Sequence, residues 1–255
     1  MRSITTPASK KSVRLWATGF WLAVWQLAGM WVGQEFLLAT PLASLRALAG
    51  LVCQPTFWGA VGFSLCRITA GFLLAAVLAA LLGTAAARHR LIGALLSPLL
   101  AAVKATPVAS FIIVALIWVP SRSLSVLISF LMVFPVLYLC IREAVESLDG
   151  ELREMADVFR VPPLRRVRYL YLPEILPRFR AAASAALGLS WKAGVAAEVI
   201  GIPAGSLGER LYEAKIYLNT PELFAWTATI VAVSAGMERL TLWLLRLAEE
   251  KWGRM

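Results

Sequence analysis

Long apolar runs, separated by short polar segments, recur along this chain of 255 residues. Each predicts a transmembrane helix, because about 20 apolar residues are needed to cross the hydrocarbon core of a bilayer. The six predicted spans are residues 15–33, 57–83, 106–119, 124–142, 181–203 and 223–246. The third is short for a full crossing, and the apolar stretch before it, 91–103, is expected to enter the membrane at an angle. The pattern predicts an all-α, polytopic membrane protein.

The composition agrees with this class of protein. Hydrophobic residues make up 60% of the chain and charged residues 16%, with a mean hydropathy of +0.74, whereas a soluble domain has about 25% charged residues. Disordered chains are poor in apolar residues, so disorder is excluded. The chain's one histidine, His89, and its three cysteines are too scattered for a zinc site. No metal and no cofactor is therefore predicted.

The net charge of +10 is distributed unevenly between the predicted loops. With the amino terminus inside, the cytoplasmic segments contain 18 Lys and Arg residues and the outer segments contain 4. This bias is the positive-inside signal of membrane proteins, and it explains the basic composition without nucleic acid. We therefore expect a multi-pass protein of a prokaryotic cytoplasmic membrane, with both termini in the cytoplasm.

Residues 143–180 form the only long polar segment, with 14 charges in 38 residues. Apolar residues recur there with helical spacing, at Leu152, Met155, Ala156 and Phe159. Pro162 and Pro163 end this amphipathic helix, and a second short helix follows, with Arg165, Arg166 and Arg168 exposed. Two interpretations remain open. The segment either lies on anionic lipid or presents an apolar ridge to a cytoplasmic protein partner.

The same segment resembles the EAA loop of type I ABC importer permeases. The pattern of that loop is Glu-Ala-Ala, three residues, Gly, nine residues, Ile, one residue and Leu-Pro. The matching residues are Glu154, Ala156, Leu172 and Pro173, with Leu170 in place of the isoleucine and Met155 as a mild departure. Arg160 stands where the pattern has glycine. Glycine there would permit a positive φ between the two helices, which arginine tolerates poorly.

Other segments share the resemblance, which covers about residues 55–246. The motif Ser64-x-x-Arg67-x-x-x-Gly71 resembles the start of the permease core. Residues 190–198 are similar to the fifth span of the nitrate/sulfonate/taurine branch, and residues 208–221 to its outer loop. The predicted organisation is a tail, first helix and outer loop (1–54), a permease core (55–246) with its coupling loop (143–180), and a cytoplasmic tail (247–255).

The resemblance implies the membrane subunit of an ATP-driven importer, with the type I permease fold and cytoplasmic coupling helices. The expected partners are two copies of an ABC ATPase subunit, an extracytoplasmic solute-binding protein, membrane lipid and a second copy of the chain in a homodimer. The residues expected to couple to the ATPase are Leu152, Glu154, Met155, Ala156, Phe159, Arg160, Leu172 and Pro173. No catalytic residue is expected, because the sequence has no G-x-x-x-x-G-K-[ST] motif for ATP.

Among the charged residues inside the predicted spans, the candidates for the translocation path are Arg67, Lys192 and Glu198. Intramembrane charges usually face a cavity or a partner. Lys192 either attracts an anionic solute such as a sulfonate, taurine or nitrate, or forms an ion pair with another span. Lys192 and Glu198 lie about 120° apart around a helix, so they are not expected to pair.

Residues 181–197 contain twelve Ala, Gly or Ser residues. Such a surface serves either static packing or sliding at a dimer interface. The rival function is an ion-coupled secondary transporter, which would show inverted repeats. No convincing internal repeat occurs, and that function would leave the EAA-like loop unexplained.

Overall fold

The computed structural model describes residues 7–148 and 150–253, and over these residues the chain forms helices and no strand. The helices are α1 (Pro7–Val32), α2 (Pro41–Val52), α3 (Pro55–Arg88), α4 (Arg90–Ala105), α5 (Val108–Ala115), α6 (Ser121–Glu146), α7 (Gly150–Val158), α8 (Pro163–Arg166), the π-helix η1 (Val167–Tyr171), α9 (Leu172–Gly201), α10 (Leu207–Ile216) and α11 (Thr220–Gly253). The predicted all-α class is confirmed.

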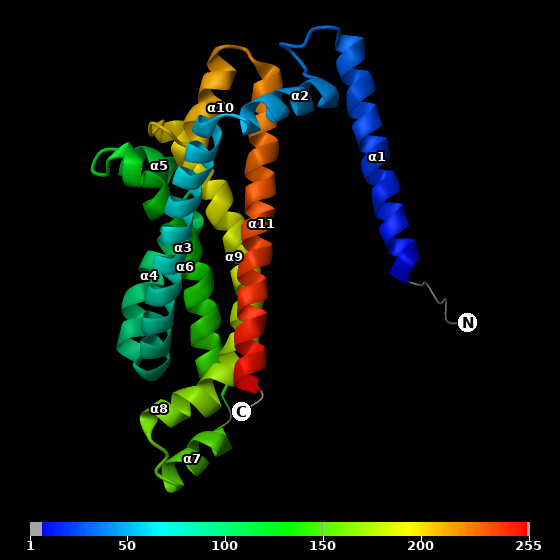
Figure 1. The fold of residues 1–255 in the computed structure, drawn as a ribbon. Helices are drawn as coiled ribbons and strands as arrows, with labels where there is room; N and C mark the ends of the chain where they lie inside the picture. The colour runs from blue at the N-terminus through cyan, green and yellow to red at the C-terminus, as the bar shows by residue number, and fades with distance from the viewer. Residues whose placement is uncertain (1–6, 149, 254–255) are drawn as a thin grey trace. The chain divides into compact units, whose positions relative to one another are not determined.

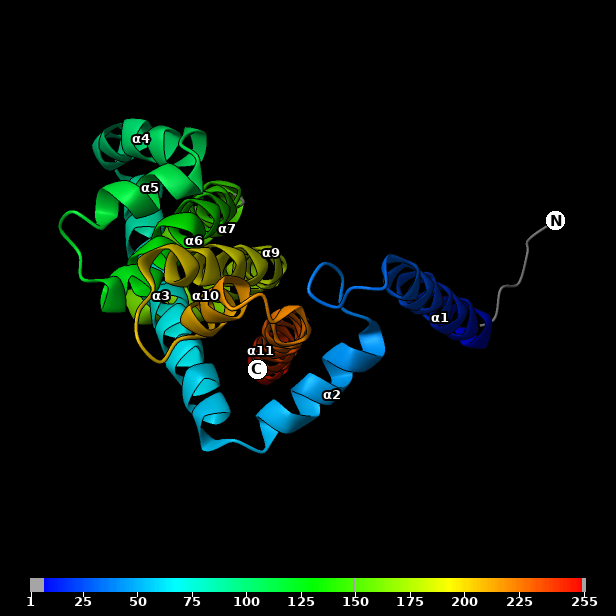
Figure 2. The same cartoon turned by 90° about the horizontal axis from the view of Figure 1, so that it is seen from above.

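The chain divides into two compact units. The first combines residues up to 58 with residues 210–229 and contains α1 and α2, which a short loop joins (Figure 2). Trp25 fixes this loop, because its indole nitrogen donates to the Ala39 carbonyl at 3.0 Å and its ring centroid lies 5.0 Å from that of Phe224. Other tryptophans of α1, such as Trp21 and Trp31, are exposed, as expected of lipid-facing side chains.

The second unit comprises residues 59–209 and 230–255, and its core is the bundle of α3, α6 and α9 (Figure 1). Glycines allow these helices to approach closely. A Cβ atom on Gly71 of α3 would lie 2.5 Å from the carbonyl oxygen of Val126 on α6. A Cβ atom on Gly194 of α9 would lie 2.7 Å from the Oγ atom of Ser129 on α6. Small residues therefore bring the three backbones together, as in other membrane bundles.

The small-residue surface of α9 has two sides. Ala183, Ala186 and Ala197 are buried within the unit, so static packing explains this side. Ala181, Ala185 and Lys192 are exposed. A sliding dimer interface therefore stays a prediction for the exposed side alone.

Three helical segments among the described residues are long and apolar enough to cross a membrane: α3, α6 and Thr220–Glu250 of α11. The pair α4 and α5 adds a fourth if it is one broken span, with a bend of 105°. This break explains why the predicted span 106–119 is too short for a full crossing. It also agrees with the expectation that the stretch before it, 91–103, enters the membrane at an angle. Helices α1 and α9 have the length of a span but are less apolar, because α1 carries four tryptophans and α9 several charges.

Candidate functional site

The predicted coupling loop, 143–180, contains α7, α8 and η1 between the end of α6 and the first turns of α9, and α7 presents an apolar ridge. Leu152, Met155 and Phe159 are exposed, and Phe159 has 74% of its surface accessible. Val158, which the helical spacing did not single out, is 78% exposed beside it. Ala156 is buried and so is not part of the exposed ridge, although it shares the predicted spacing. We call Leu152, Met155, Val158 and Phe159 the α7 ridge.

Arg160 ends α7 in the left-handed conformation, with φ of 49°. Its amide donates to the Asp157 carbonyl at 3.0 Å, and the Val161 amide donates to the Ala156 carbonyl at 2.9 Å. These two bonds form a Schellman motif with Arg160 at the position where glycine is usual. The backbone path that a glycine would favour is therefore kept with an arginine, at a conformational cost of about 1–2 kcal/mol.

Arg166 of α8 joins the two arms of the loop. Its guanidinium group donates to the carbonyl oxygens of Val161 at 2.7 Å and of Ala156 at 2.9 Å, and it forms an ion pair with Asp157. The prediction that Arg166 is exposed was wrong, because helical spacing shows a side chain's face but not the partner that crosses a turn. Leu172 and Pro173 begin α9, where proline suits the first turn.

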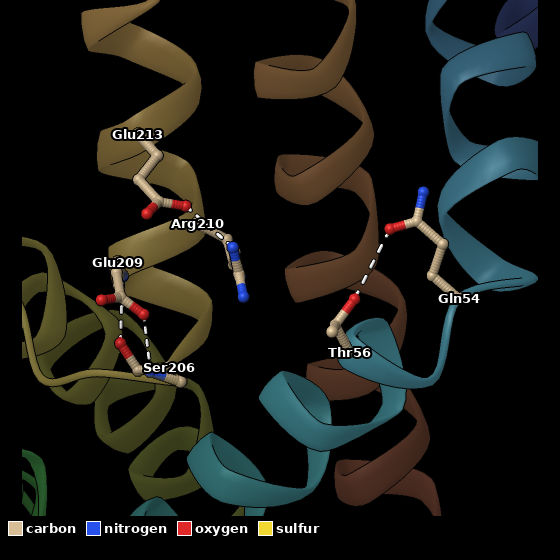
Figure 3. A network of polar contacts seen from close by, with 7 residues as sticks. Gln54, Thr56, Ser206, Glu209, Arg210 and Glu213 are labelled. Carbon is tan, nitrogen blue, oxygen red and sulfur yellow. Dashed lines mark hydrogen bonds and ion pairs between the residues drawn. The ribbon is translucent and has the colours of Figure 1, made fainter.

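The amino end of α10 is a second group of functional interest, and Figure 3 shows its first turn. The Glu209 amide donates to Ser206 Oγ at 3.0 Å, while the Glu209 carboxylate accepts from the Gly205 amide at 2.5 Å. This is a variant of the capping box. It satisfies only one of the amides that begin the helix.

The two preceding amides donate to side chains of α3 and α9. The Leu207 amide donates to Ser64 Oγ at 2.9 Å, and the Gly208 amide donates to Glu198 Oε2 at 3.3 Å. The Ser64 hydroxyl in turn donates to the same carboxylate oxygen at 2.6 Å. We call Ser64, Glu198, Leu207 and Gly208 the carboxylate clamp.

Close packing accompanies these bonds. A Cβ atom on Gly208 would lie 2.4 Å from Glu198 Cβ, so only glycine lets α10 begin this close to α9. Ser64 and Glu198 are both 0% exposed. Ser64 was not a predicted site residue, although it belongs to a motif that the sequence singled out.

The three predicted path residues lie in different surroundings. Glu198 is buried in the clamp, whereas Lys192 is exposed on α9. Arg67 is half-buried on α3, with its guanidinium carbon 4.2 Å from the centroid of the Phe63 ring. No ion pair joins any two of the three, which are all within the described residues. Glu238 of α11, another charged residue inside a predicted span, accepts from Ser184 Oγ at 2.5 Å.

Comparison with known proteins shows that most of the chain matches one protein family. Residues 71–252 match the family described as "Binding-protein-dependent transport system inner membrane component". The chain is 26% identical over 233 residues to a putative aliphatic sulfonates transport permease protein of Bacillus subtilis, covering 90% of this chain and 82% of that protein. It is 25% identical to a bicarbonate transport system permease protein of Synechococcus elongatus, covering 74% and 68%. A probable ABC transporter permease protein of Brucella melitensis is 26% identical, covering 80% and 83%.

The hydrogen bonds of the carboxylate clamp are expected to stabilise the fold. Replacing Ser64 by alanine removes the acceptor of the buried Leu207 amide and a donor to Glu198, so we expect a loss of about 2–3 kcal/mol. The control is Ser129→Ala, another fully buried serine, which removes one bond of 3.2 Å to the Ser190 carbonyl. The melting temperature of the purified chain in detergent should fall clearly further for Ser64→Ala. Equal shifts would show that the clamp does not stabilise the fold.

The positive φ of Arg160 is expected to strain the turn after α7. Arg160→Gly should stabilise the turn by about 1 kcal/mol, because glycine adopts a positive φ without steric cost. Hydrogen exchange of the Arg160 and Val161 amides, measured by mass spectrometry, should slow in this variant. The control Arg160→Ala removes the same side chain but keeps the Cβ atom, so it should not slow exchange. If alanine and glycine protect the turn equally, the strain is absent.

Proposed function

We propose a function from one premise: the chain belongs to the family of binding-protein-dependent transport system inner membrane components. It is therefore a multi-pass permease subunit of the inner membrane. We propose that it serves an ATP-driven importer, in which it forms the path of a small solute and couples to a separate ATPase subunit. The observation that carries the proposal is the exposed α7 ridge, in the loop that resembles the EAA loop.

The α7 ridge is suited to a protein partner. Its four apolar side chains are exposed on a helix that also carries Glu151, Glu154 and Asp157. Anionic lipid would repel these carboxylates, which favours docking to a protein over lying on the membrane. Arg166 fixes α7 to α8, so force applied to the ridge would move the loop as one body. Two ATPase subunits on a homodimer, with both termini in the cytoplasm, complete the proposed assembly.

An anionic solute is the proposed cargo. Two relatives are named for aliphatic sulfonates and for bicarbonate, which are both anions. Lys192 is an exposed cation on α9, on the same side as the exposed residues Ala181, Ala185 and Leu189. A lysine there can attract an anion from a path lined by α9. The buried Glu198 is better suited to hold the helices, and an extracytoplasmic binding protein would select the solute.

The docking proposal is tested at Phe159. Phe159→Ala should weaken binding of the ATPase subunit by about 2 kcal/mol or more, as expected of a central aromatic anchor. The measurement is the amount of ATPase that co-purifies with the tagged chain in mild detergent. Tyr217→Ala is the control, because Tyr217 is a similarly exposed aromatic directly after α10, in a predicted outer segment. If ATPase recovery is the same for both variants, the α7 ridge is not the docking surface.

The solute proposal is tested at Lys192. Lys192→Met should lower uptake at low solute concentration by about tenfold, because a charge-assisted contact to the anion is lost. The probes are radiolabelled taurine and bicarbonate, supplied to cells with the complete transporter. Lys192→Arg keeps the charge and should retain most of the uptake that the unmodified transporter shows. Unchanged uptake by Lys192→Met at normal expression would contradict the role of Lys192.

A further inference from the structure

A polar cleft lies between α4 and α6, in the second unit. It consists of two cavities of about 380 and 210 Å³ that share Gly93, Ser97 and Arg142 as lining residues. Arg90 lines one cavity, and Lys104 and Tyr138 line the other. We call these six residues the α4–α6 cleft. None of them belongs to the α7 ridge, the carboxylate clamp or the predicted path.

The cleft carries an excess of positive charge. Arg142 donates from Nε to Glu146 at 2.7 Å, which compensates one cation. Arg90 and Lys104 are exposed and form no ion pair within the described chain. Glu143 lines a neighbouring cavity with Lys104 but does not pair with it either. Two uncompensated cations therefore face a cleft that can admit an anion.

Tyr138 provides independent support for a ligand. The residue is 1% exposed, its hydroxyl group interacts with the Arg142 guanidinium, and its own proton has no acceptor among the described residues. A buried tyrosine hydroxyl usually finds a partner. Since Tyr138 lines the cavity together with Arg142, Lys104 and Ser97, its unused donor is available to an acceptor bound there.

The backbone of α4 is shaped to the cleft. A Cβ atom on Gly93 would lie 3.3 Å from an Nη atom of Arg142, so glycine leaves room for the guanidinium group against α4. A larger residue at position 93 would push this cation out of its place. The Arg142 guanidinium, Lys104 and the hydroxyl groups of Ser97 and Tyr138 line one cavity, which matches the oxygens of a phosphate group, and Arg90 adds positive charge from the adjoining cavity.

The outer face of α4 indicates that such a phosphate would belong to a lipid head group. Leu91, Leu95 and Leu99 recur at every fourth position and are exposed, forming a stripe suited to acyl chains. The cleft residues Gly93, Ser97 and Lys104 lie on another side of the same helix. Helix α4 follows a predicted cytoplasmic segment, and basic pockets between membrane helices on that side bind anionic head groups. We propose that the α4–α6 cleft binds the phosphate head group of an anionic phospholipid.

Native mass spectrometry of the full chain tests the proposal, with phosphatidylglycerol and phosphatidylcholine as probes. The chain should retain phosphatidylglycerol in preference to phosphatidylcholine. Exchanging Arg90 and Lys104 together for glutamine should weaken phosphatidylglycerol binding by roughly 25-fold, at about fivefold for each charge. Tyr138→Phe should also weaken it while keeping the buried ring. The control Arg122→Gln removes an exposed cation at the start of α6, in a predicted outer segment, and should leave binding unchanged.

Several outcomes would overturn the proposal. Equal retention of the two lipids, or full retention by the double variant, would show that the cleft does not recognise the head group. A second arm adds inorganic phosphate in place of lipid. If phosphate alone binds to the cleft and displaces phosphatidylglycerol at equal concentration, the ligand is a free phosphate and the lipid assignment is wrong.

Discussion

The buried carboxylate of Glu198 is the constraint on which the second unit depends. A carboxyl group is expensive to bury in a membrane protein unless hydrogen-bond donors compensate it. Ser64 and the Gly208 amide provide such donors, and the positive end of the α10 dipole lies at the same place. The same bonds satisfy amides that cannot reach water inside the protein. The carboxyl group and the start of α10 therefore stabilise each other, and losing Ser64 would leave the Leu207 amide without its acceptor and Glu198 with one donor fewer.

This requirement explains the close packing around it. Ser64 can reach Glu198 only if α3 lies against α9, although 134 residues separate the two in sequence. Gly71 and Gly194 permit that approach, with Ser129 of α6 beside both. Gly208 then lets α10 begin directly on α9. The three segments that showed the family resemblance outside the coupling loop thus meet at one group of contacts, which gives their unusual residues a common physical reason.

Local patterns were sufficient for the helices but not for the contacts between them. Apolar length predicted α3, α6 and α11, and helical spacing predicted α7, because each signal is contained within one segment. The partners of Glu198 come from distant segments, so no local spacing could identify them. The exposure of Arg166 was predicted wrongly for a related reason. Its partners are carbonyl groups that become accessible only through the turn at Arg160. Ala156 shows the same limit, because spacing alone could not tell a ridge residue from one buried under the loop.

Helix α9 connects the two functional groups of the molecule. It begins at Leu172, within the predicted coupling loop, and reaches Glu198 in its last turn, so its 30 residues extend about 45 Å. The π-helix η1 precedes it, and such irregular turns often occur at functional positions. A push on the α7 ridge would pass through the Arg166 contacts into η1 and then along α9, which is one continuous helix. Because the far end is held by the carboxylate clamp, α3 and α10 would have to move with α9. The proposed coupling therefore requires a rigid clamp as much as an exposed ridge, which would give the buried Glu198 carboxylate a supporting part in it.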